Sequence, residues 1–191
     1  MNTQEILSRL TLTEKISLLT GKNFWQTQEV DRANIPSLWL SDGPHGVRKI
    51  RDAENQQYDI VNATCFPTAS SMASTWNRSL IKKVGHALGE ECQAYQVDIL
   101  LGPGVNIKRT PLCGRNFEYY SEDPVLAGEC GAAYIKGIQQ TGVGACVKHF
   151  AANNQEYDRW TISAEIDERA LREIYLPAFE TVIRESNPIS V

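Results

Sequence analysis

The sequence lacks three features that would assign the protein to a membrane, a secretion route or a nucleic acid. No apolar run reaches the roughly 20 residues that span a bilayer, and the amino end has no basic stretch followed by an apolar one. Lys and Arg (19) do not outnumber Asp and Glu (23), so no concentrated basic face for phosphates is expected. We therefore expect a soluble, cytoplasmic protein that binds neither membranes nor nucleic acid.

Cysteine, histidine and glycine are arranged too sparsely for three common kinds of site. The five cysteines are an odd number and form no C-x-x-C pair, so we expect reduced thiols rather than disulfides or a zinc site. His45 has no second His or Cys at metal-ligand spacing and is interpreted as a loop residue. Gly102 and Gly104 lack the third glycine of a dinucleotide-binding fingerprint, which argues against a phosphate-binding loop.

The sequence does contain alternating helical and strand-like segments. Apolar residues make up 42% of the 191 residues, enough for a sizeable core. Apolar positions three and four residues apart predict a helix over 78–95, in which Gly85 and Gly89 allow close approach of another element. Capping signals and apolar stripes predict further helices over 11–21, leading into the core, from Asp123-Pro124 towards Gly137, and from Asp167 to Ile183 with a kink at Pro177.

Three apolar segments end in glycine, proline or charged residues, as buried strands do. They are 38–40 before Asp42, 97–101 before Gly102, and 144–147 before Lys148 and His149; Pro188–Val191 begins to look like one more. Such an alternation is typical of a parallel α/β sheet with its site at the carboxyl ends of the strands. Since a (β/α)₈ barrel usually takes about 250 residues, we expect residues 1–191 to form one incomplete TIM barrel, roughly its first half, with outer helices.

The strand ends carry the first candidate functional residues. Asp42 lies in the stretch Ser41-Asp-Gly-Pro-His-Gly-Val-Arg48, where it could accept hydrogen bonds from hydroxyl groups, act in catalysis, or simply bond to its own turn. Arg48 could be solvated or paired with an aspartate. Lys148 and His149 occupy the same kind of position after the third strand, and four polar residues follow them: Asn153, Asn154, Glu156 and Arg159.

A long loop over 102–124 carries further candidates. It is rich in glycine and proline, and loops of this length without regular structure are more often functional than not. Glu122 and Asp123 are interpreted as helix-capping acids, and His86 as a solvated residue off the apolar stripe of its helix. The charged and amide side chains that could serve a site are Arg109, Arg115, Asn116 and Glu118.

Four motifs follow one another along the chain: Ser41-Asp-Gly-Pro-His-Gly-Val-Arg48, Gly102-Pro-Gly-Val-Asn-Ile, Gly114-Arg-Asn-Phe-Glu-Tyr-Tyr-Ser-Glu-Asp-Pro124 and Val147-Lys-His-Phe150. Together they resemble the N-terminal barrel domain of family 3 glycoside hydrolases, the β-glucosidase group. The resemblance covers most of the chain from about Leu12, and Gly-Arg-Asn-Phe-Glu is its most specific part. It implies a retaining enzyme that releases terminal β-D-glucosyl residues from β-glucosides or oligosaccharides.

The resemblance also implies roles for six residues. Asp42 would accept hydrogen bonds from hydroxyl groups of the glycosyl ring in subsite −1, and Arg115, Lys148 and His149 would bind other hydroxyls of that ring. Arg48 and Arg159 match positions at or beside the same subsite. These residue types suit the roles, because a charged acceptor with charged donors opposite gives stronger and more directional hydrogen bonds than neutral pairs.

The residues that break the bond in this family do not occur in the sequence. The family's nucleophile is an Asp in a Ser-Asp-Trp type motif on a later strand, and its acid/base comes from a further loop or domain; neither is found within the 191 residues. We therefore expect this polypeptide alone to lack β-glucosidase activity and a longer protein containing it to be active. No cofactor is expected, because two carboxyl groups suffice for this reaction.

Two alternatives remain open from the sequence. The chain could be a non-catalytic carbohydrate-binding or structural module that has kept the barrel motifs. It could also belong to a different barrel enzyme that uses Lys148 as a Schiff-base amine, which requires a desolvated lysine. The surrounding charged candidates make the second alternative the weaker one.

Overall fold

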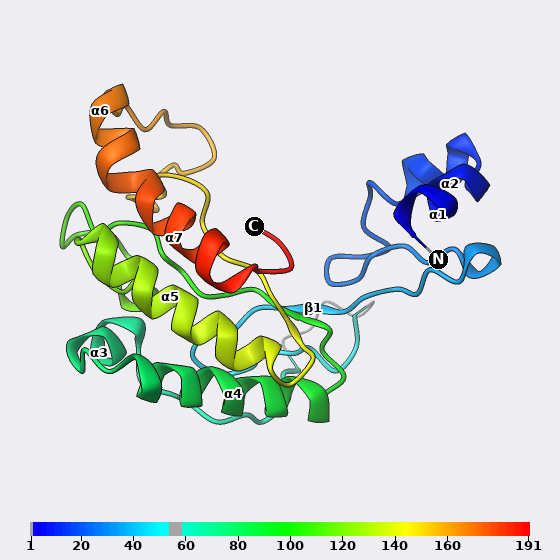
Figure 1. Ribbon diagram of the computed structural model, residues 1–191, viewed down its shortest axis with the longest axis horizontal. Coiled ribbons are helices and arrows are strands. Elements are labelled where there is room, and N and C mark those ends of the chain that lie inside the picture. Colours follow the sequence, from blue (N-terminus) through cyan, green and yellow to red (C-terminus); the bar gives the residue numbers. More distant parts are fainter. Residues whose placement is uncertain (1, 54–58) are drawn as a thin grey trace.

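The structure is a computed structural model that describes residues 2–53 and 59–191 (Figure 1). Three short parallel strands form its sheet in the order β1 (Leu40–Ser41), β2 (Ile99–Leu100) and β3 (Gly144–Ala145). Single parallel bridges extend the sheet, from Gly104 to Lys148 and from Cys146 to Ser190. The α/β class is confirmed, and the described residues form a partial parallel sheet rather than a closed barrel.

The strands are shorter than the sequence predicts. The first begins at Leu40 instead of Leu38, because the backbone of Leu38 bonds to Thr27: its carbonyl accepts from the Thr27 N–H at 3.0 Å, and its N–H donates to Thr27 Oγ1 at 2.8 Å. The backbone of Leu38 therefore pairs with Thr27 and does not extend strand β1. The bridge at Ser190 agrees with the strand-like character expected at 188–191.

Three helices pack side by side in a layer over this sheet (Figure 1). They are α4 (Arg78–Ala94), α5 (Pro124–Gln139), which lies between the other two, and α7 (Leu176–Ser186). The predicted face of α4 is confirmed, since Ile81, Leu88 and Cys92 are fully buried. The N-cap of this helix is Asn77, whose side chain accepts a hydrogen bond from the Leu80 N–H at 3.0 Å.

Helices α4 and α5 approach each other closely because both carry glycine at their contact. A Cβ atom placed on Gly85 would lie 2.3 Å from the Tyr134 carbonyl oxygen, and one on Gly137 would lie 2.1 Å from the Lys82 carbonyl oxygen. Neither position has room for a side chain. Helix α5 begins as predicted: Asp123 is its N-cap and accepts from the Val125 N–H at 2.7 Å.

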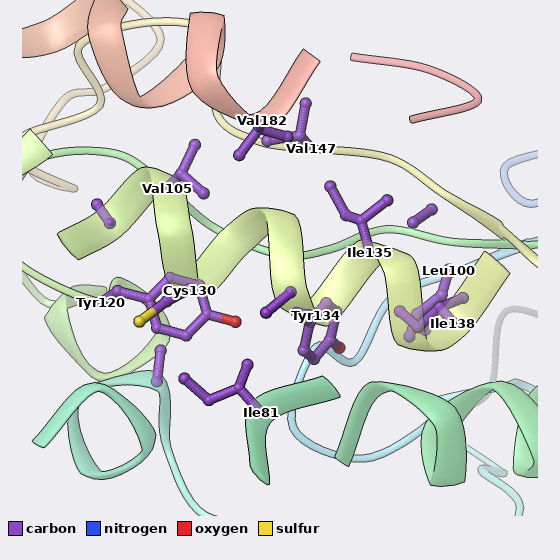
Figure 2. Packing of buried hydrophobic residues seen from close by; sticks show 14 of the residues in the cluster. Ile81, Leu100, Val105, Tyr120, Cys130, Tyr134, Ile135, Ile138, Val147 and Val182 are labelled. Carbon is purple, nitrogen blue, oxygen red and sulfur yellow. The ribbon is translucent and has the colours of Figure 1, made fainter. Parts of the chain in front are cut away.

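The core lies between these helices and the sheet, and Figure 2 shows it around α5. Tyr134 and Ile135 of α5 are fully buried, as are Leu100 of β2 and Val147 beyond β3. Tyr134 also reaches past the core, because its hydroxyl donates to the Pro44 carbonyl at 2.7 Å. The helix layer is thereby tied to the turn that follows Asp42.

The last helical stretch shows how the chain accommodates Pro177. It runs from α6 (Glu168–Ala170), capped by Asp167 as predicted, through a π-helical turn η3 (Leu171–Tyr175) into α7. In η3 the Leu176 N–H donates to the Leu171 carbonyl five residues back. The distortion expected at the proline is therefore a π-turn directly before it. The apolar stripe is only partly buried, because Ile174 and Ile183 are 40% and 45% exposed.

The N-terminal helices α1 (Thr3–Arg9) and α2 (Leu12–Ser17) lie apart from the helix layer (Figure 1). The predicted capping box of α2 is present between Thr11 and Glu14, but the helix ends at Ser17 instead of Gly21. The expectation that its apolar face leads into the core is wrong: Leu12 is 73% exposed and Leu19 is 87% exposed. The reason is that this face packs against no part of the described core cluster.

The remaining elements are short. The segment over 49–62 pairs Ile50 with Ile60 in an antiparallel bridge, and its residues 54–58 lie outside the described part. Among the described residues, none of the helices combines the length and the apolar character of a membrane-spanning segment. The short elements are η1 (Asp31–Ala33), α3 (Ala69–Ser74) and η2 (Asn116–Glu118).

Candidate functional site

The carboxyl ends of the parallel strands bring the predicted motifs to one edge of the sheet. Asp42 follows β1, and Lys148 lies beyond β3, bridged to the segment after β2 at Gly104. A cavity of about 670 Å³ opens beside them. It is lined by the turn 42–48, by Val61 and residues 63–65, and by Arg115, Phe117, Glu118, Glu156 and Arg159.

The turn after β1 fixes Asp42 at this cavity. The Asp42 carbonyl accepts from the Arg48 N–H at 3.0 Å, and Gly43 adopts φ +114°, a conformation that favours glycine. The Asp42 carboxylate accepts from Lys148 Nζ at 2.8 Å and lies 3.5 Å from an Arg48 guanidinium nitrogen. Burial raises the pKa of Asp42, but Lys148 and Arg48 outweigh it, so the pKa lies below its usual value. The carboxylate therefore remains charged at neutral pH.

Lys148 lies between two carboxylates. Its side chain is only 12% exposed, and Nζ lies 2.8 Å from Asp42 Oδ1 and 3.6 Å from Glu118 Oε2. Both contacts engage Nζ with carboxylate oxygens. The geometry therefore favours a role for Lys148 as a hydrogen-bond donor.

Glu118 is a candidate of the long loop for which the sequence predicts no specific role. It is 3% exposed, and within residues 2–53 and 59–191 no other carboxylate is as deeply buried. Its Oε1 accepts a hydrogen bond from Arg115 Nε. The spacing Arg115-x-x-Glu118 indicates that the two side chains can pair on one side of the turn η2, but it does not reveal the burial of Glu118.

Arg115 and His149 are joined directly. An arginine N–H can only donate, so the contact of 2.7 Å between Arg115 Nη2 and His149 Nε2 makes Nε2 the acceptor. The proton of the neutral ring is then on Nδ1, which lies 2.8 Å from the Tyr119 hydroxyl. Burial, with Arg115 and Lys148 nearby, lowers the pKa of His149 to about 3. The imidazole is therefore neutral across the physiological range.

Arg159 reaches the cavity from the loop that follows His149. Its Nη1 donates to Glu156 Oε2 at 2.8 Å, while Glu156 Oε1 accepts from Asn153 at 2.9 Å and lies 3.9 Å from Arg115 Nε. The guanidinium also stacks over the exposed ring of Trp160, 4.7 Å from its centre. Glu156 thus links Arg159 to Arg115.

The structure brings all six predicted residues into one connected network. Arg48 contacts Asp42, which contacts Lys148. Glu118 connects Lys148 to Arg115. Arg115 in turn contacts His149 and Glu156, and Glu156 is the partner of Arg159. Among the other candidates, His45 lines the cavity, Arg109 lines a neighbouring one, and His86 lies half-exposed on α4 beside Glu90. Asn116 stays outside the network, since its amide donates to the Thr110 carbonyl.

No cluster of metal-ligating side chains occurs in the part of the chain that the structure describes. All five cysteines are free thiols. The arrangement at the cavity is instead one of alternating carboxylates and cations. Such a lining can accept and donate several charge-assisted hydrogen bonds to a neutral polyhydroxy ligand.

The chain is similar in sequence to proteins that are named for their action on glycosides. The chain is 56% identical over 187 residues to the thermostable beta-glucosidase B of Acetivibrio thermocellus, matching 97% of the chain and 25% of that protein. It is 51% identical over 185 residues to an exo-alpha-(1->6)-L-arabinopyranosidase of Bifidobacterium longum, matching 95% of the chain and 24% of that protein. The chain thus spans about a quarter of the length of the curated relatives it matches.

Solved structures show the same fold. Beta-glucosidase 3B from Thermotoga neapolitana, in complex with glucose, superposes with a TM-score of 0.90 at 48% identity, covering 97% of this chain and 28% of that one. The beta-glucosidase from Kluyveromyces marxianus in complex with glucose gives 0.93 at 40% identity, covering all of this chain and 22% of that one. The family model for the glycosyl hydrolase family 3 N-terminal domain matches residues 8–191. The chain belongs to glycosyl hydrolase family 3, as part of that N-terminal domain.

Proposed function

We propose that this chain supplies the sugar-binding part of a retaining β-glucosidase, which releases terminal β-D-glucosyl residues from β-glucosides or oligosaccharides. The observation that carries the proposal is the network of Asp42, Lys148, Glu118, Arg115 and His149 at the carboxyl ends of parallel strands. Glucose-binding relatives of the same fold support it.

In this proposal the glucosyl ring binds in subsite −1 against the network. Asp42 accepts hydrogen bonds from ring hydroxyls, and Lys148 and Arg115 donate to others. The remaining predicted ligands are Arg48, Arg159 and His149. The two ring nitrogens of His149 contact Arg115 and Tyr119, so binding a sugar hydroxyl would require it to exchange one of these partners. Charge-assisted hydrogen bonds of this kind hold a neutral sugar in one orientation, which places its anomeric carbon for attack.

The bond-breaking carboxylates are proposed to come from other parts of the family's enzyme. A retaining mechanism needs a nucleophile and an acid/base roughly 5–5.5 Å apart, and the sequence of the chain contains no Ser-Asp-Trp motif. Two carboxyl groups are sufficient for this chemistry, so the proposal includes no cofactor. The cytoplasmic location expected from the sequence stays a prediction.

A second candidate substrate is an α-L-arabinopyranoside. The relative from Bifidobacterium longum is named for this specificity and is nearly as similar to the chain as the glucosidase. An arabinopyranosyl ring has no hydroxymethyl group at C5. A site for the glucosyl ring must therefore have room for this group, whereas a site for the arabinopyranosyl ring need not.

The direct test is a transplant. In what we call the transplanted enzyme, this chain replaces the matching 187-residue segment of the Acetivibrio thermocellus protein. We expect it to hydrolyse 4-nitrophenyl β-D-glucoside with kcat/KM within about tenfold of the parent, and 4-nitrophenyl α-L-arabinopyranoside more slowly. The 191-residue chain alone should hydrolyse neither.

A folded transplanted enzyme without activity on either substrate would contradict the proposal and favour a non-catalytic sugar-binding module. Preference for the arabinopyranoside would select the second candidate. Binding of D-glucose to the isolated chain, measured by NMR line broadening, separates a module that binds sugar from one that does not.

A further inference from the structure

Two of the proposed sugar-binding cations converge on one buried carboxylate, that of Glu118. Its Oε1 accepts from Arg115 Nε, and its Oε2 lies 3.6 Å from Lys148 Nζ. The side chain is 4% exposed, and it also lines the cavity. The two oxygens of a single carboxylate thus connect the two cations.

Burial of the Glu118 carboxylate costs hydration free energy, and its place between two cations gives a reason for that cost. A charged carboxyl group removed from water loses several kcal/mol of hydration unless partners replace it. A hydrophobic side chain of similar volume often stabilises a fold as well as a buried ion pair does. The feature that a hydrophobic side chain could not reproduce here is the orientation of the two cations.

The contacts leave each cation with donors for a ligand. Lys148 has three N–H groups, of which Asp42 and Glu118 can take two. Arg115 uses Nε on Glu118 and Nη2 on His149, and its Nη1 forms no hydrogen bond or ion pair with a described residue. The remaining donors of both residues are therefore restricted in direction by the same carboxylate.

We propose that Glu118 is a positioning residue for sugar binding, which orients the free donors of Arg115 and Lys148 towards one pyranose ring. This inference rests on the proposed function. Without the charge of Glu118, the Lys148 ammonium would pair with Asp42 alone, and the Arg115 guanidinium could rotate about its side chain. The hydroxyl groups of the ring would then meet donors in several orientations.

The test is Glu118→Gln in the transplanted enzyme, which keeps the volume and removes the charge. We expect kcat/KM for 4-nitrophenyl β-D-glucoside to fall about 30-fold and the inhibition constant of D-glucose to rise about tenfold. The matched control is Glu173→Gln, which removes an exposed partner of Arg169 at 3.1 Å. Its kinetic constants should stay within about twofold of the unsubstituted enzyme.

A double-mutant cycle separates positioning from a general loss of structure. Because only the part of the effect that acts through Arg115 remains when Lys148 is already Met, the Glu118→Gln substitution should cost about tenfold or less in that background, against about 30-fold alone. A purely structural role would cost the full factor in both backgrounds and would overturn the proposal. Glu118→Asp keeps the charge and should recover at least about threefold of what Gln loses; no recovery would also overturn it.

The outcomes distinguish this inference from the function on which it rests. Absence of turnover in the unsubstituted transplanted enzyme refutes the proposed function. Normal turnover in that enzyme together with an equally active Glu118→Gln variant refutes only the role of Glu118. Thermal unfolding of each variant identifies any loss of folding, and the Asp variant then provides the decisive comparison.

Discussion

The helix layer and the charged edge of the sheet are built on opposite principles. In the layer, α4 and α5 meet through glycines and fully buried apolar side chains such as Leu88. At the edge, carboxylates and cations alternate, and Asp42 and Lys148 are paired at 2.8 Å. We infer that substitutions in the layer should lower stability, while substitutions at the edge should mainly lower sugar binding and turnover.

The largest effect should come from a cavity in the layer. Leu88→Ala removes a fully buried side chain from α4 and should lower the free energy of unfolding by about 3 kcal/mol. Leu12→Ala is the matched control. Leu12 is 73% exposed, so the same change there should cost less than about 0.5 kcal/mol. Urea unfolding of the two variants measures the difference, and equal losses would contradict the described core.

The next effect should appear at the edge. Lys148→Met in the transplanted enzyme keeps most of the volume but removes the ammonium, so kcat/KM for the glucoside should fall about 30-fold. Lys136→Met removes a half-exposed lysine that lies 3.4 Å from Glu185 on the helix layer, and it should leave turnover unchanged. If the two lysine variants were equally active, the site would lie elsewhere.

The pH dependence of stability should report on His149. Its pKa is lowered to about 3 in the folded chain, whereas an unfolded chain protonates histidine near pH 6.5. Between these values the unfolded state binds the extra proton, so stability falls as the pH is lowered through that window, by at most about 1.4 kcal/mol per pH unit. His149→Gln should flatten the curve between pH 6.5 and 4.5. Urea midpoints that stay parallel to those of the unsubstituted chain would show that the histidine is not buried as described.

The smallest effect should separate two helix caps. Asp123→Ala removes the N-cap of buried helix α5 and should cost about 1 kcal/mol of global stability. Asn2→Ala removes the N-cap of α1, a helix without buried residues, and should leave the main urea transition unchanged. Equal shifts of that transition would show that α1 unfolds together with the helix layer.

The fold was largely predictable because its signals are local. The N-caps Asp123 and Asp167, the apolar face of α4 and the polar ends of the strands follow from short-range spacing. The exposed face of α2 was not predictable, since an amphipathic pattern gives the face of a helix but not whether a partner covers it.

The site was predictable in part for the same reason. Five of its six predicted residues stand in a motif at a strand end or in the long loop, and the parallel sheet explains why these motifs meet. The sixth, Arg159, lies in the loop that follows His149. Glu118 was not assigned, because its burial and its contact with Lys148 depend on residues 30 positions apart in the chain. Burial of a charge is a tertiary property that no local pattern reveals.

The most direct test of the central claim, that the charged edge holds the glycosyl ring, is Asp42→Ala in the transplanted enzyme. We predict that kcat/KM for 4-nitrophenyl β-D-glucoside falls at least about 100-fold, about 2.7 kcal/mol, with little change in the unfolding temperature. Asp59→Ala, at a side chain that is 69% exposed and pairs with Arg51, should have no such effect. A change confined to the preference for the leaving group would place Asp42 outside the ring-binding subsite and contradict the claim.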